Sequence, residues 1–462
     1  MSAQRVPLFR KAQHIHFVGI GGSGMSGIAE VLLNLSFTVS GSDLARTPVT
    51  ERLASLGATI HLDHAQENIK GAHVVVISSA VGPENPEVME ARRSKVPVIP
   101  RAEMLGELMR MKYGVAIAGS HGKTSTTAMV AQVLSGAGLD PTIVIGGRLN
   151  ILDSSAKLGK GDLMVAEADE SDGSFLRLAP TIAVVTNIDT EHLNHYGTMD
   201  ALVDAFAGFL NKVPFYGLGI VCLDDPQIQR IMPRLTRTLL TYGLASQADL
   251  VGTNLELKEF TSRFEVTFRG RWLGDVRLSV PGRHSIYNAL AAIGVGLEFD
   301  LKFPDIAEHL AEFSGADRRF QLRGSAGDIL VIDDYGHHPT EIRATLSAAR
   351  DGWSRRRVVV FQPHRYSRVQ GLMEEFSRSF YQADVLIVTE IYKAGETPIP
   401  GVNGEALVAA IKEHGHKDVS HAPDLDAASR LLLEKVRPGD MVITLGAGDV
   451  WKVAERFLKD AS

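Results

Sequence analysis

The sequence predicts an α/β protein divided into three domains, and three observations lead to this fold class. Short apolar runs rich in Val and Ile alternate with helical patterns, as is typical of parallel strands buried on both faces. At 462 residues, the chain is too long for one compact core, at roughly 150 residues per domain. A strand and Gly-rich turn open at His14 and again at Tyr113, and a third series of strands begins near Ile329.

We expect domain boundaries near residues 110 and 322, which gives domains of residues 1–110, 111–322 and 323–462. Between about Leu255 and Val280, apolar and polar residues alternate. This period of two predicts antiparallel strands at the edge of the middle sheet, with Gly270 near a hairpin turn. The expected parallel strands are HIHFVGI, HVVVIS, YGVAIAG, LMVAEA, IAVVTNI, ILVIDDYG, RVVVFQ, VLIVTE and MVITLG.

Composition and charge are those of an ordinary globular enzyme. Hydrophobic residues make up 45% of the chain, and the net charge of −6 comes from interleaved acidic and basic residues, without a basic stripe for nucleic acid. No apolar run approaches the roughly 20 residues that span a bilayer, and the first residues do not form a signal-peptide core. Because Cys222 is the single cysteine, no internal disulfide can form and we expect a cytoplasmic protein. From the charge pattern and the lack of an apolar span, we expect neither nucleic acid nor a membrane as partner.

The segment GSHGKTST predicts a phosphate-binding turn between a strand and a helix. Its glycines let backbone N–H groups approach phosphate oxygens, Lys123 supplies a positive charge, and Thr124 offers a hydroxyl to magnesium. The spacing departs from the full P-loop because Ile117 stands at the position of the first glycine. The alternative is a strand-to-helix turn without a ligand. The expected ATP-binding residues of this segment are Gly119, Ser120, His121, Gly122, Lys123, Thr124 and Ser125.

Two further Gly-rich turns follow strands. Near the N-terminus, Gly19, Gly21 and Gly24 form G-x-G-x-x-G, and Asp43 lies at a suitable distance for a ribose contact. The motif suits a dinucleotide, and equally any nucleotide diphosphate seated on a helix N-terminus. The third turn, VITLGAGDV, lies close to the C-terminus.

Carboxylates and histidines gather after two neighbouring strands of the middle domain. Glu167 ends the strand LMVAE, and His192 follows the next strand. The ends of parallel strands meet at one sheet edge, so a divalent cation beside the P-loop would neutralise these carboxylates. The alternatives are a solvated acidic loop and a histidine that only caps a helix. The wider acidic set is Asp162, Glu167, Asp169, Glu170 and Asp172, and the next strand is followed by Asn187, Asp189, Glu191, His192 and His195.

The C-terminal domain offers two polar segments after strands. In DDYGHHP, His337 and His338 point opposite ways and are not expected to chelate one ion, while Asp334 could orient a nucleotide or the P-loop lysine. In FQPHRYSR, His364 and Arg365 suit a carboxylate or phosphate of a substrate. A solvated basic face is the alternative for this second segment.

In this order, the motifs resemble those of the Mur ligase family, ATP-dependent enzymes that add amino acids to the bacterial peptidoglycan precursor. The likeness covers nearly the whole chain. Ser120 stands where threonine is usual in the family, and NIDTEHL differs slightly from the usual spelling but keeps the histidine. The matching segments are HFVGIGGSGMSGIAEVL, GSHGKTSTT, EADESDGSF, TNIDTEHLNHYG, PGRHSIYNALAA, FSGADRRF, DDYGHHPTEI, FQPHRYSR and TLGAGD.

The resemblance implies a Rossmann-like N-terminal domain for the uridine diphosphate, a central P-loop ATPase-type domain with a mostly parallel sheet, and a Rossmann-like C-terminal domain that admits the amino acid. The implied reaction joins L-alanine to the carboxylate of UDP-N-acetylmuramate at the expense of ATP, through an acyl phosphate. Magnesium is the implied cofactor. We expect a monomer or a homodimer.

The resemblance also assigns roles to single residues. Lys123 would contact the β- and γ-phosphates, Thr124 and Glu167 would hold one magnesium ion, and Glu167 with His192 would serve a second. His284 and Asn288 would approach the adenine side of ATP, and Arg319 with Asp334 would reach the nucleotide on domain closure; these two complete the expected catalytic set with Lys123, Glu167 and His192. The expected substrate contacts are Gly19, Gly21, Gly22, Ser23, Asp43, Ser79, His337, His364 and Arg365.

Three other functions compete with this interpretation. The nearest is that of a relative which joins a recycled tripeptide to the same sugar nucleotide. A nicotinamide-dependent dehydrogenase would account for the N-terminal glycines, yet it leaves GSHGKTST and the acidic strand ends without a role. A nucleotide-sensing module without turnover is the third.

Overall fold

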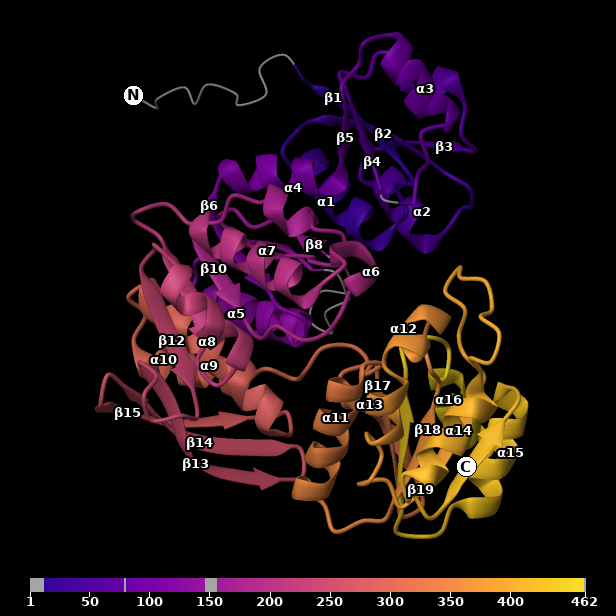
Figure 1. Ribbon diagram of the computed structural model, residues 1–462. Coiled ribbons are helices and arrows are strands. Elements are labelled where there is room, and N and C mark those ends of the chain that lie inside the picture. The colour runs from indigo at the N-terminus through magenta and orange to yellow at the C-terminus, as the bar shows by residue number, and fades with distance from the viewer. Residues whose placement is uncertain (1–11, 79, 146–155, 461–462) are drawn as a thin grey trace. The chain divides into compact units, whose positions relative to one another are not determined.

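The computed structural model describes residues 12–78, 80–145 and 156–460 (Figure 1). It confirms the α/β class, with three sheets of mostly parallel strands. By their internal contacts the residues form two compact units. Unit 1 comprises Met1–Gly252, Val266–Gly274 and Tyr287–Leu310, and unit 2 comprises Thr253–Glu265, Asp275–Ile286 and Ala311–Ser462. No helix within the described ranges is long and apolar enough to cross a membrane.

The first sheet of unit 1 has five parallel strands in the order β3-β2-β1-β4-β5. The chain leaves the central β1 for β2 and later returns to β4 on its other side, so the carboxyl end of β1 lies at a topological switch point, where open α/β sheets bind ligands. The elements are β1 His14–Val18, α1 Ser23–Asn34, β2 Thr38–Asp43, α2 Pro48–Ser55, β3 Thr59–Leu62, η1 Gln66–Ile69, β4 Val74–Ile77, α3 Pro86–Arg93, β5 Val98–Pro100 and α4 Arg101–Arg110.

The second sheet has the order β15-β14-β13-β12-β11-β10-β6-β9-β7-β8. Strand β6 pairs in parallel with both β10 and β9, so the carboxyl ends of these three strands meet at one edge. The strands are β6 Tyr113–Ala118, β7 Thr142–Val144, β8 Ala156–Lys157, β9 Leu163–Glu167, β10 Ile182–Val185, β11 Leu218–Cys222, β12 Leu239–Gly243, β13 Leu250–Lys258, β14 Thr261–Phe268 and β15 Arg271–Leu278. The helices are α5 Lys123–Gly136, η2 Ser174–Arg177, α6 Leu193–Tyr196, α7 Met199–Asn211, α8 Pro226–Ile231, η3 Met232–Arg234, α9 Arg283–Glu298 and α10 Phe303–Ala311.

The predicted hairpin is confirmed, since Gly270 lies between β14 and β15 with φ +77°, a conformation that favours glycine. These strands also lie at the edge of the middle sheet, as expected. The sequence patterns did not predict several strands, among them β5, β7 and β16. They are short or poor in β-branched residues, and such strands give a weak period in the sequence.

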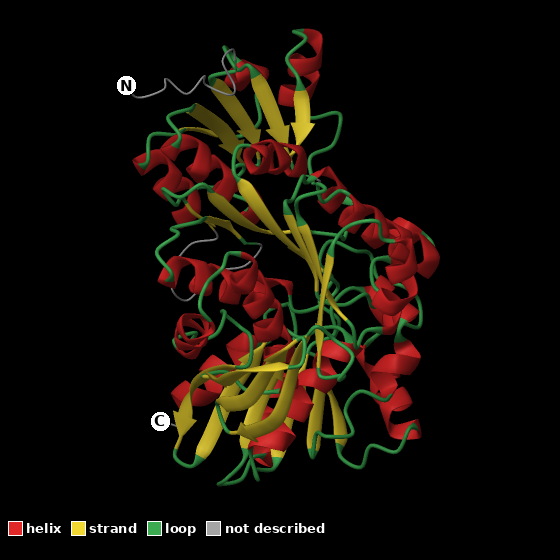
Figure 2. Cartoon of the chain, turned by 90° about the vertical axis from the view of Figure 1, so that its left-hand side faces the viewer, coloured by secondary structure: helices red, strands yellow, loops and turns green. Residues whose placement is uncertain are grey.

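The third sheet, in unit 2, has the order β16-β17-β21-β18-β19-β20; β16 runs antiparallel to β17, and the other neighbours pair in parallel. Helices pack against both of its faces. Figure 2 shows the helices of the whole chain in red and its strands in yellow. Along β17, Ile332 packs against α11 and Val331 packs against α16, which explains the continuous apolar runs. The elements are β16 Gln321–Ala326, β17 Ile329–Asp334, α11 Pro339–Gly352, β18 Arg357–Phe361, α12 Tyr366–Gly371, α13 Met373–Ser377, β19 Val385–Thr389, α14 Gly404–Glu413, β20 Val419–Ala422, α15 Leu425–Lys435, β21 Met441–Leu445 and α16 Trp451–Asp460.

A buried ionic cluster ties the first sheet to helix α3. The Glu87 side chain is fully buried; its carboxylate accepts hydrogen bonds of 2.6 Å from Ser42 and Asn68 and lies 3.5 Å from His16 and 3.2 Å from His64. Burial alone would raise the pKa of Glu87, but the nearby His16 and the hydrogen bonds from Ser42 and Asn68 lower it to about 2. The cluster therefore stabilises the fold with Glu87 ionised.

The lowered pKa of Glu87 predicts how the free energy of unfolding depends on pH. The contribution of Glu87 is fully present above its ordinary pKa of 4.5 and is lost as the pH falls toward 2. We expect Glu87→Gln to destabilise the protein by about 3 kcal/mol at pH 7 and to flatten the acid limb of the stability curve. Urea unfolding between pH 2.5 and 7 measures both effects. Glu67→Gln, at an exposed position nearby, is the control; equal curves for the two variants would contradict the prediction.

Candidate functional site

The segment GSHGKTST forms a tight turn between β6 and α5. Gly122 precedes α5 with φ +80°, and Gly119 has φ +133°, so both adopt conformations that favour glycine. A Cβ atom on Gly119 would lie 2.0 Å from Thr186 Oγ1. The turn thus packs directly against the end of β10, and its helix N-terminus lies at the edge where three strands end.

Lys123, the first residue of α5, points back into its own turn. Its Nζ donates hydrogen bonds to the carbonyl oxygens of Gly119 at 2.7 Å and Ser120 at 3.1 Å, and to Glu170 Oε1 at 2.8 Å. Burial alone would lower the pKa of Lys123, but the carboxylates of Glu170 and Glu167 raise it. Lys123 is therefore a cation held at a helix N-terminus, a place that favours anions.

Glu170, Glu191 and His192 form a cluster beside this lysine. Glu170 Oε1 lies 3.6 Å from His192 Nε2, which lies 3.8 Å from Glu191 Oε2, and ligand atoms of all three lie within 4.8 Å of one another. Burial raises the pKa of Glu170 to about 7, against the opposing charge of Lys123. Glu170 Oε2 is buried and accepts no hydrogen bond from the residues that the structure describes. Two carboxylates, an imidazole and an unsatisfied oxygen fit a divalent cation.

Thr124 and Glu167, expected to hold one magnesium ion, are in direct contact. Thr124 Oγ1 donates a hydrogen bond of 3.1 Å to Glu167 Oε2, and Glu167 is the last residue of β9. The structure thus brings together Lys123, Thr124 and Glu167 at the edge that the sequence indicated. It adds Glu170 and Glu191 to the expected ligand His192.

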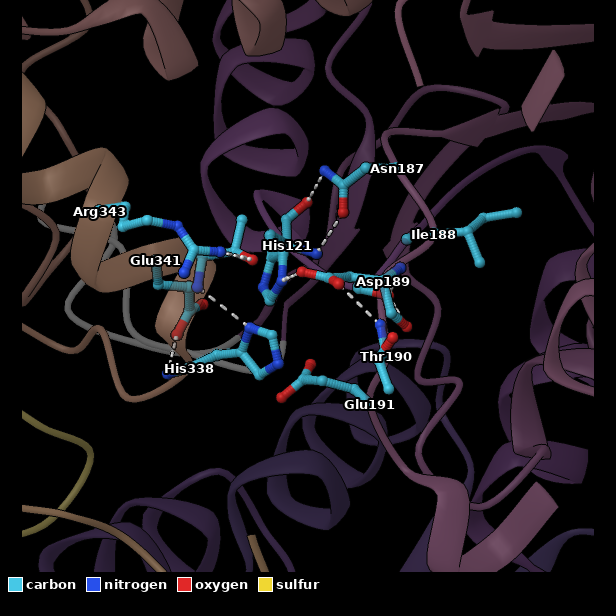
Figure 3. Close-up of polar contacts among 12 residues, drawn as sticks. His121, Asn187, Ile188, Asp189, Thr190, Glu191, His338, Glu341 and Arg343 are labelled. Carbon is cyan, nitrogen blue, oxygen red and sulfur yellow. Dashed lines mark hydrogen bonds and ion pairs between the residues drawn. The ribbon is translucent and has the colours of Figure 1, made fainter. Parts of the chain in front are cut away.

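His121 is held by the end of β10 (Figure 3). Its Nε2 lies 2.9 Å from Asp189 Oδ2, and its backbone N–H donates to Asn187 Oδ1 at 2.8 Å. Asn187 Nδ2 in turn donates to the carbonyl oxygen of His121 at 3.0 Å. These three contacts hold the middle of the turn against the segment that follows β10.

The residues expected on the adenine side both lie on α9. Asn288 Oδ1 accepts a hydrogen bond of 3.1 Å from Thr126, and a Cβ on Gly122 would lie 2.6 Å from the same oxygen. Asn288 therefore packs against the start of α5. His284 is partly buried, and this burial, with the nearby charge of Arg319, lowers its pKa to about 4. His284 is neutral at physiological pH.

In unit 2, Asp334 ends β17 and holds the loops on either side of the strand. Its carboxylate accepts hydrogen bonds of 2.7 Å from the backbone N–H groups of Phe320 and Gly336. Burial raises its pKa, against the opposing charge of Arg319. The Arg319 guanidinium lies over the Tyr335 ring, 5.1 Å from its centroid. Asp334 thus orders the segment that carries Arg319.

His337, His364 and Arg365 also lie together in unit 2. The His337 and His364 rings are 5.6 Å apart, and His364 stacks on Tyr392 at 5.6 Å. Burial, and then the charge of His337, lowers the pKa of His364 to about 3. Arg365 directly precedes α12 as its N-cap with φ +68°, and its N–H donates to the Tyr392 carbonyl at 2.9 Å. A cavity of about 500 Å³ adjoins them, lined by Gln362, Thr389, Glu390, Ile391, Tyr392, Lys393, Ala394, Gly395, Asp424 and Leu425.

The C-terminal Gly-rich turn is filled by a side chain of its own domain. Gln362 Oε1 accepts hydrogen bonds from the N–H groups of Asp449 at 2.9 Å and Val450 at 3.2 Å, just before α16. Gln362 Nε2 donates to Asp449 Oδ1 at 2.9 Å. A Cβ on Gly448 would lie 2.3 Å from Gln362 Oε1. The backbone donors that could bind a phosphate are therefore engaged.

The N-terminal Gly-rich turn lies at the switch point of the first sheet. Gly19 has φ +78°, and its N–H donates to the Ser42 carbonyl at 2.9 Å, while the Gly21 N–H donates to Asp43 Oδ2 at 2.8 Å. Asp43 thus shapes the turn itself. Gly22 caps α1, which starts at Ser23. Ser79, another expected substrate contact, lies outside the described residues.

Sequence reasoning did not single out three of the groups that build these sites. Glu170 and Glu191 were predicted only as members of acidic segments, with no specific role. The fold brings both of them close to His192. No sequence pattern predicted a role for Gln362, because glutamine side chains are common in loops. The buried pair Arg318 and Asp333, 2.8 Å apart, could have been suspected from a carboxylate inside a strand.

Three family models match the chain in order. They are described as Mur ligase family, catalytic domain, over residues 14–113; Mur ligase middle domain, over residues 117–296; and Mur ligase, glutamate ligase domain, over residues 318–448. Together they span most of the chain.

Individual proteins give a more specific likeness. The chain is 57% identical over 452 residues to a UDP-N-acetylmuramate–L-alanine ligase of Geotalea uraniireducens, covering 98% of this chain and 99% of the relative. It is 56% identical to the protein of the same name from Geobacter sulfurreducens, with 98% of each chain covered. A crystal structure of the UDP-N-acetylmuramate–alanine ligase from Thermotoga maritima matches with a TM-score of 0.80 and 29% identity, over 97% of this chain and 98% of that one. A murein peptide ligase from Psychrobacter arcticus shares the fold, with a TM-score of 0.69 and 23% identity over 97% and 98% of the two chains.

Proposed function

The chain belongs to the Mur ligase family, and on this premise we propose that it joins L-alanine to the carboxylate of UDP-N-acetylmuramate with hydrolysis of ATP, in peptidoglycan precursor synthesis. Identity of 55–57% to ligases of that name over nearly the whole chain supports the substrates. The single structural observation that carries the chemistry is Lys123, a partly buried cation at a P-loop helix N-terminus beside Glu167 and the cluster of Glu170, Glu191 and His192.

The reaction has to overcome the repulsion between two anions. The lactyl carboxylate is a poor acyl donor, so one of its oxygens attacks the γ-phosphorus of ATP, and ADP leaves. Lys123 holds its positive charge where the phosphates would lie, and the α5 N-terminus adds backbone N–H donors. The amine of L-alanine, in its neutral form, then attacks the acyl carbon of the acyl phosphate, and inorganic phosphate leaves as the amine gives up a proton.

The structure offers residues that would hold a divalent cation. Thr124 and Glu167 would contribute one set of oxygens, and His192 with Glu170 and Glu191 would contribute a second. Magnesium, when bound, supplies charge neutralisation of the phosphate oxygens. The protein itself orients these groups through the backbone bonds of the turn and the end of β10.

The roles of the other expected residues are part of the proposal. Asn288 and His284 flank the adenine side on α9, and Arg319 with Asp334 would serve the nucleotide from unit 2. His337, His364 and Arg365 would receive the amino acid. ATP and nucleotide sugars are cytoplasmic metabolites, so we place the enzyme in the cytoplasm, with the uridine nucleotide on residues 1–110, ATP on residues 111–322 and the amino acid on residues 323–462.

Phosphate release with ATP, magnesium and UDP-N-acetylmuramate tests the function. We expect sustained release only when L-alanine is also present, a product heavier than the sugar nucleotide by one alanyl group, and loss of turnover on chelation of the metal. Release that needs the recycled tripeptide in place of L-alanine would assign the chain to the competing activity. Release independent of the sugar nucleotide would contradict both.

A further inference from the structure

Arg101, the first residue of α4, lies against the N-terminal Gly-rich turn. A Cβ atom on Gly24 would lie 2.8 Å from Arg101 Nη1, 3.0 Å from its Cδ and 3.1 Å from its Cζ. The absence of a side chain at Gly24 thus leaves room for the guanidinium beside the start of α1. Arg101 follows β5 directly, so it is placed by the same sheet edge that carries the turn.

A cation beside this turn would add to the backbone donors of the α1 N-terminus in holding a diphosphate. Residues 19–26 contain no lysine or arginine, and Asp43 brings a carboxylate to the Gly21 N–H. The N-terminus of α1 supplies only the partial charge of its backbone donors. An arginine, with five N–H donors in a planar fork, matches phosphate oxygens better than an ammonium group does.

Arg101 also reaches the acidic loop of the ATP site. Its Nη2 lies 3.7 Å from Asp169 Oδ2, and Asp169 directly precedes Glu170. The Arg101 side chain is 26% exposed, so a ligand can reach it without a change in its packing. One edge of the guanidinium can face Asp169 while the other binds a phosphate.

We propose that Arg101 binds the diphosphate of the sugar nucleotide and joins that site to the acidic loop beside Lys123. This inference rests on the proposed function for the identity of the ligand. Arg101 is a substrate-binding residue in this scheme, and it also positions Asp169. Helix α4 supports the arrangement, because a Cβ on Gly106 would lie 2.6 Å from the Arg177 carbonyl oxygen, so the helix packs closely on η2.

Binding of UDP and of uridine to the full chain without ATP tests the phosphate contact directly. We expect Arg101→Ala to weaken UDP binding about 10- to 100-fold, the range for a charged hydrogen-bonding group, and to leave uridine binding within twofold. Arg101→Lys should recover part of the loss. In ligation, KM for UDP-N-acetylmuramate should rise in parallel, with KM for ATP nearly unchanged.

Two further variants separate this contact from a structural role. Gly24→Ala should displace the guanidinium from the turn and weaken UDP binding in the same direction without removing the charge. Arg177→Ala removes another ion pair of α4, that with Glu103 at 3.0 Å, and should leave UDP binding unchanged. It therefore serves as the matched control for any loosening of α4.

The outcomes distinguish the inference from the proposed function. If Arg101→Ala binds UDP within twofold of the parent protein, or weakens UDP and uridine equally, the inference is overturned even when the parent ligates L-alanine. If the parent does not ligate L-alanine but Arg101→Ala loses UDP affinity selectively, the proposed function fails and the diphosphate contact stands.

Discussion

Replacement of Lys123 by methionine is expected to lower kcat for ligation by about 10³-fold, since one positioned charge of this kind contributes several kcal/mol to phosphoryl transfer. Methionine keeps most of the length of the side chain and removes its charge. Binding of UDP should be unchanged, because the N-terminal turn does not involve Lys123. Steady-state phosphate release and UDP titration on the same preparation measure the two effects.

The stability of this variant provides its internal control. Loss of Lys123 leaves Glu170 buried without its cation, but burial already raises the pKa of Glu170 to about 7, so the carboxyl group can protonate. We therefore expect only a small decrease in melting temperature at pH 6 and a larger one at pH 8. The double variant Lys123→Met with Glu170→Gln should melt near the parent at both pH values and remain inactive. An active single variant would remove Lys123 from the mechanism.

Glu170→Gln is expected to have the second largest effect. The change keeps the shape of the side chain, but it removes the charge that holds Lys123 and one carboxylate of the cluster with Glu191 and His192. We expect kcat to fall about 10²-fold and the magnesium concentration for half-maximal activity to rise about tenfold. A magnesium titration of the ligation rate measures both.

Asp172→Asn is the matched control for Glu170→Gln. Asp172 lies two residues away in the same acidic loop, is exposed, and accepts a backbone hydrogen bond from Ser174. Its replacement should change neither the rate nor the magnesium requirement by more than twofold. A similar loss in both variants would mean that the net charge of the loop matters, and not the position of Glu170.

The sequence predicted the parts of the fold that depend on local pattern. The apolar runs became β1, β4, β6, β9, β10, β17, β18, β19 and β21, because a strand buried on both faces needs an unbroken series of apolar residues. The short β7 and the edge strand β16 carry no such series. The order of the strands in a sheet decides which strand ends lie side by side, and local sequence patterns do not predict that order.

The same distinction applies to the site. Lys123 and Thr124 could be found because a phosphate-binding turn has a local spacing, and Glu167 because it ends a strand. Glu170 lies in the loop after that strand, among several acidic residues that the sequence cannot tell apart. Arg101 gave no signal at all, since its partner Gly24 is 77 positions earlier in the chain.

The third Gly-rich turn has the sequence pattern of a phosphate-binding turn, but a side chain of the protein already engages its backbone N–H groups. A pyrophosphate would have to displace Gln362 from the Asp449 and Val450 N–H groups, and the glutamine is part of the same chain. The C-terminal domain therefore keeps a Gly-rich turn between a strand and a helix, and Gln362 occupies the backbone donors of that turn. The cavity of this domain lies beside Tyr392, whose ring stacks on that of His364.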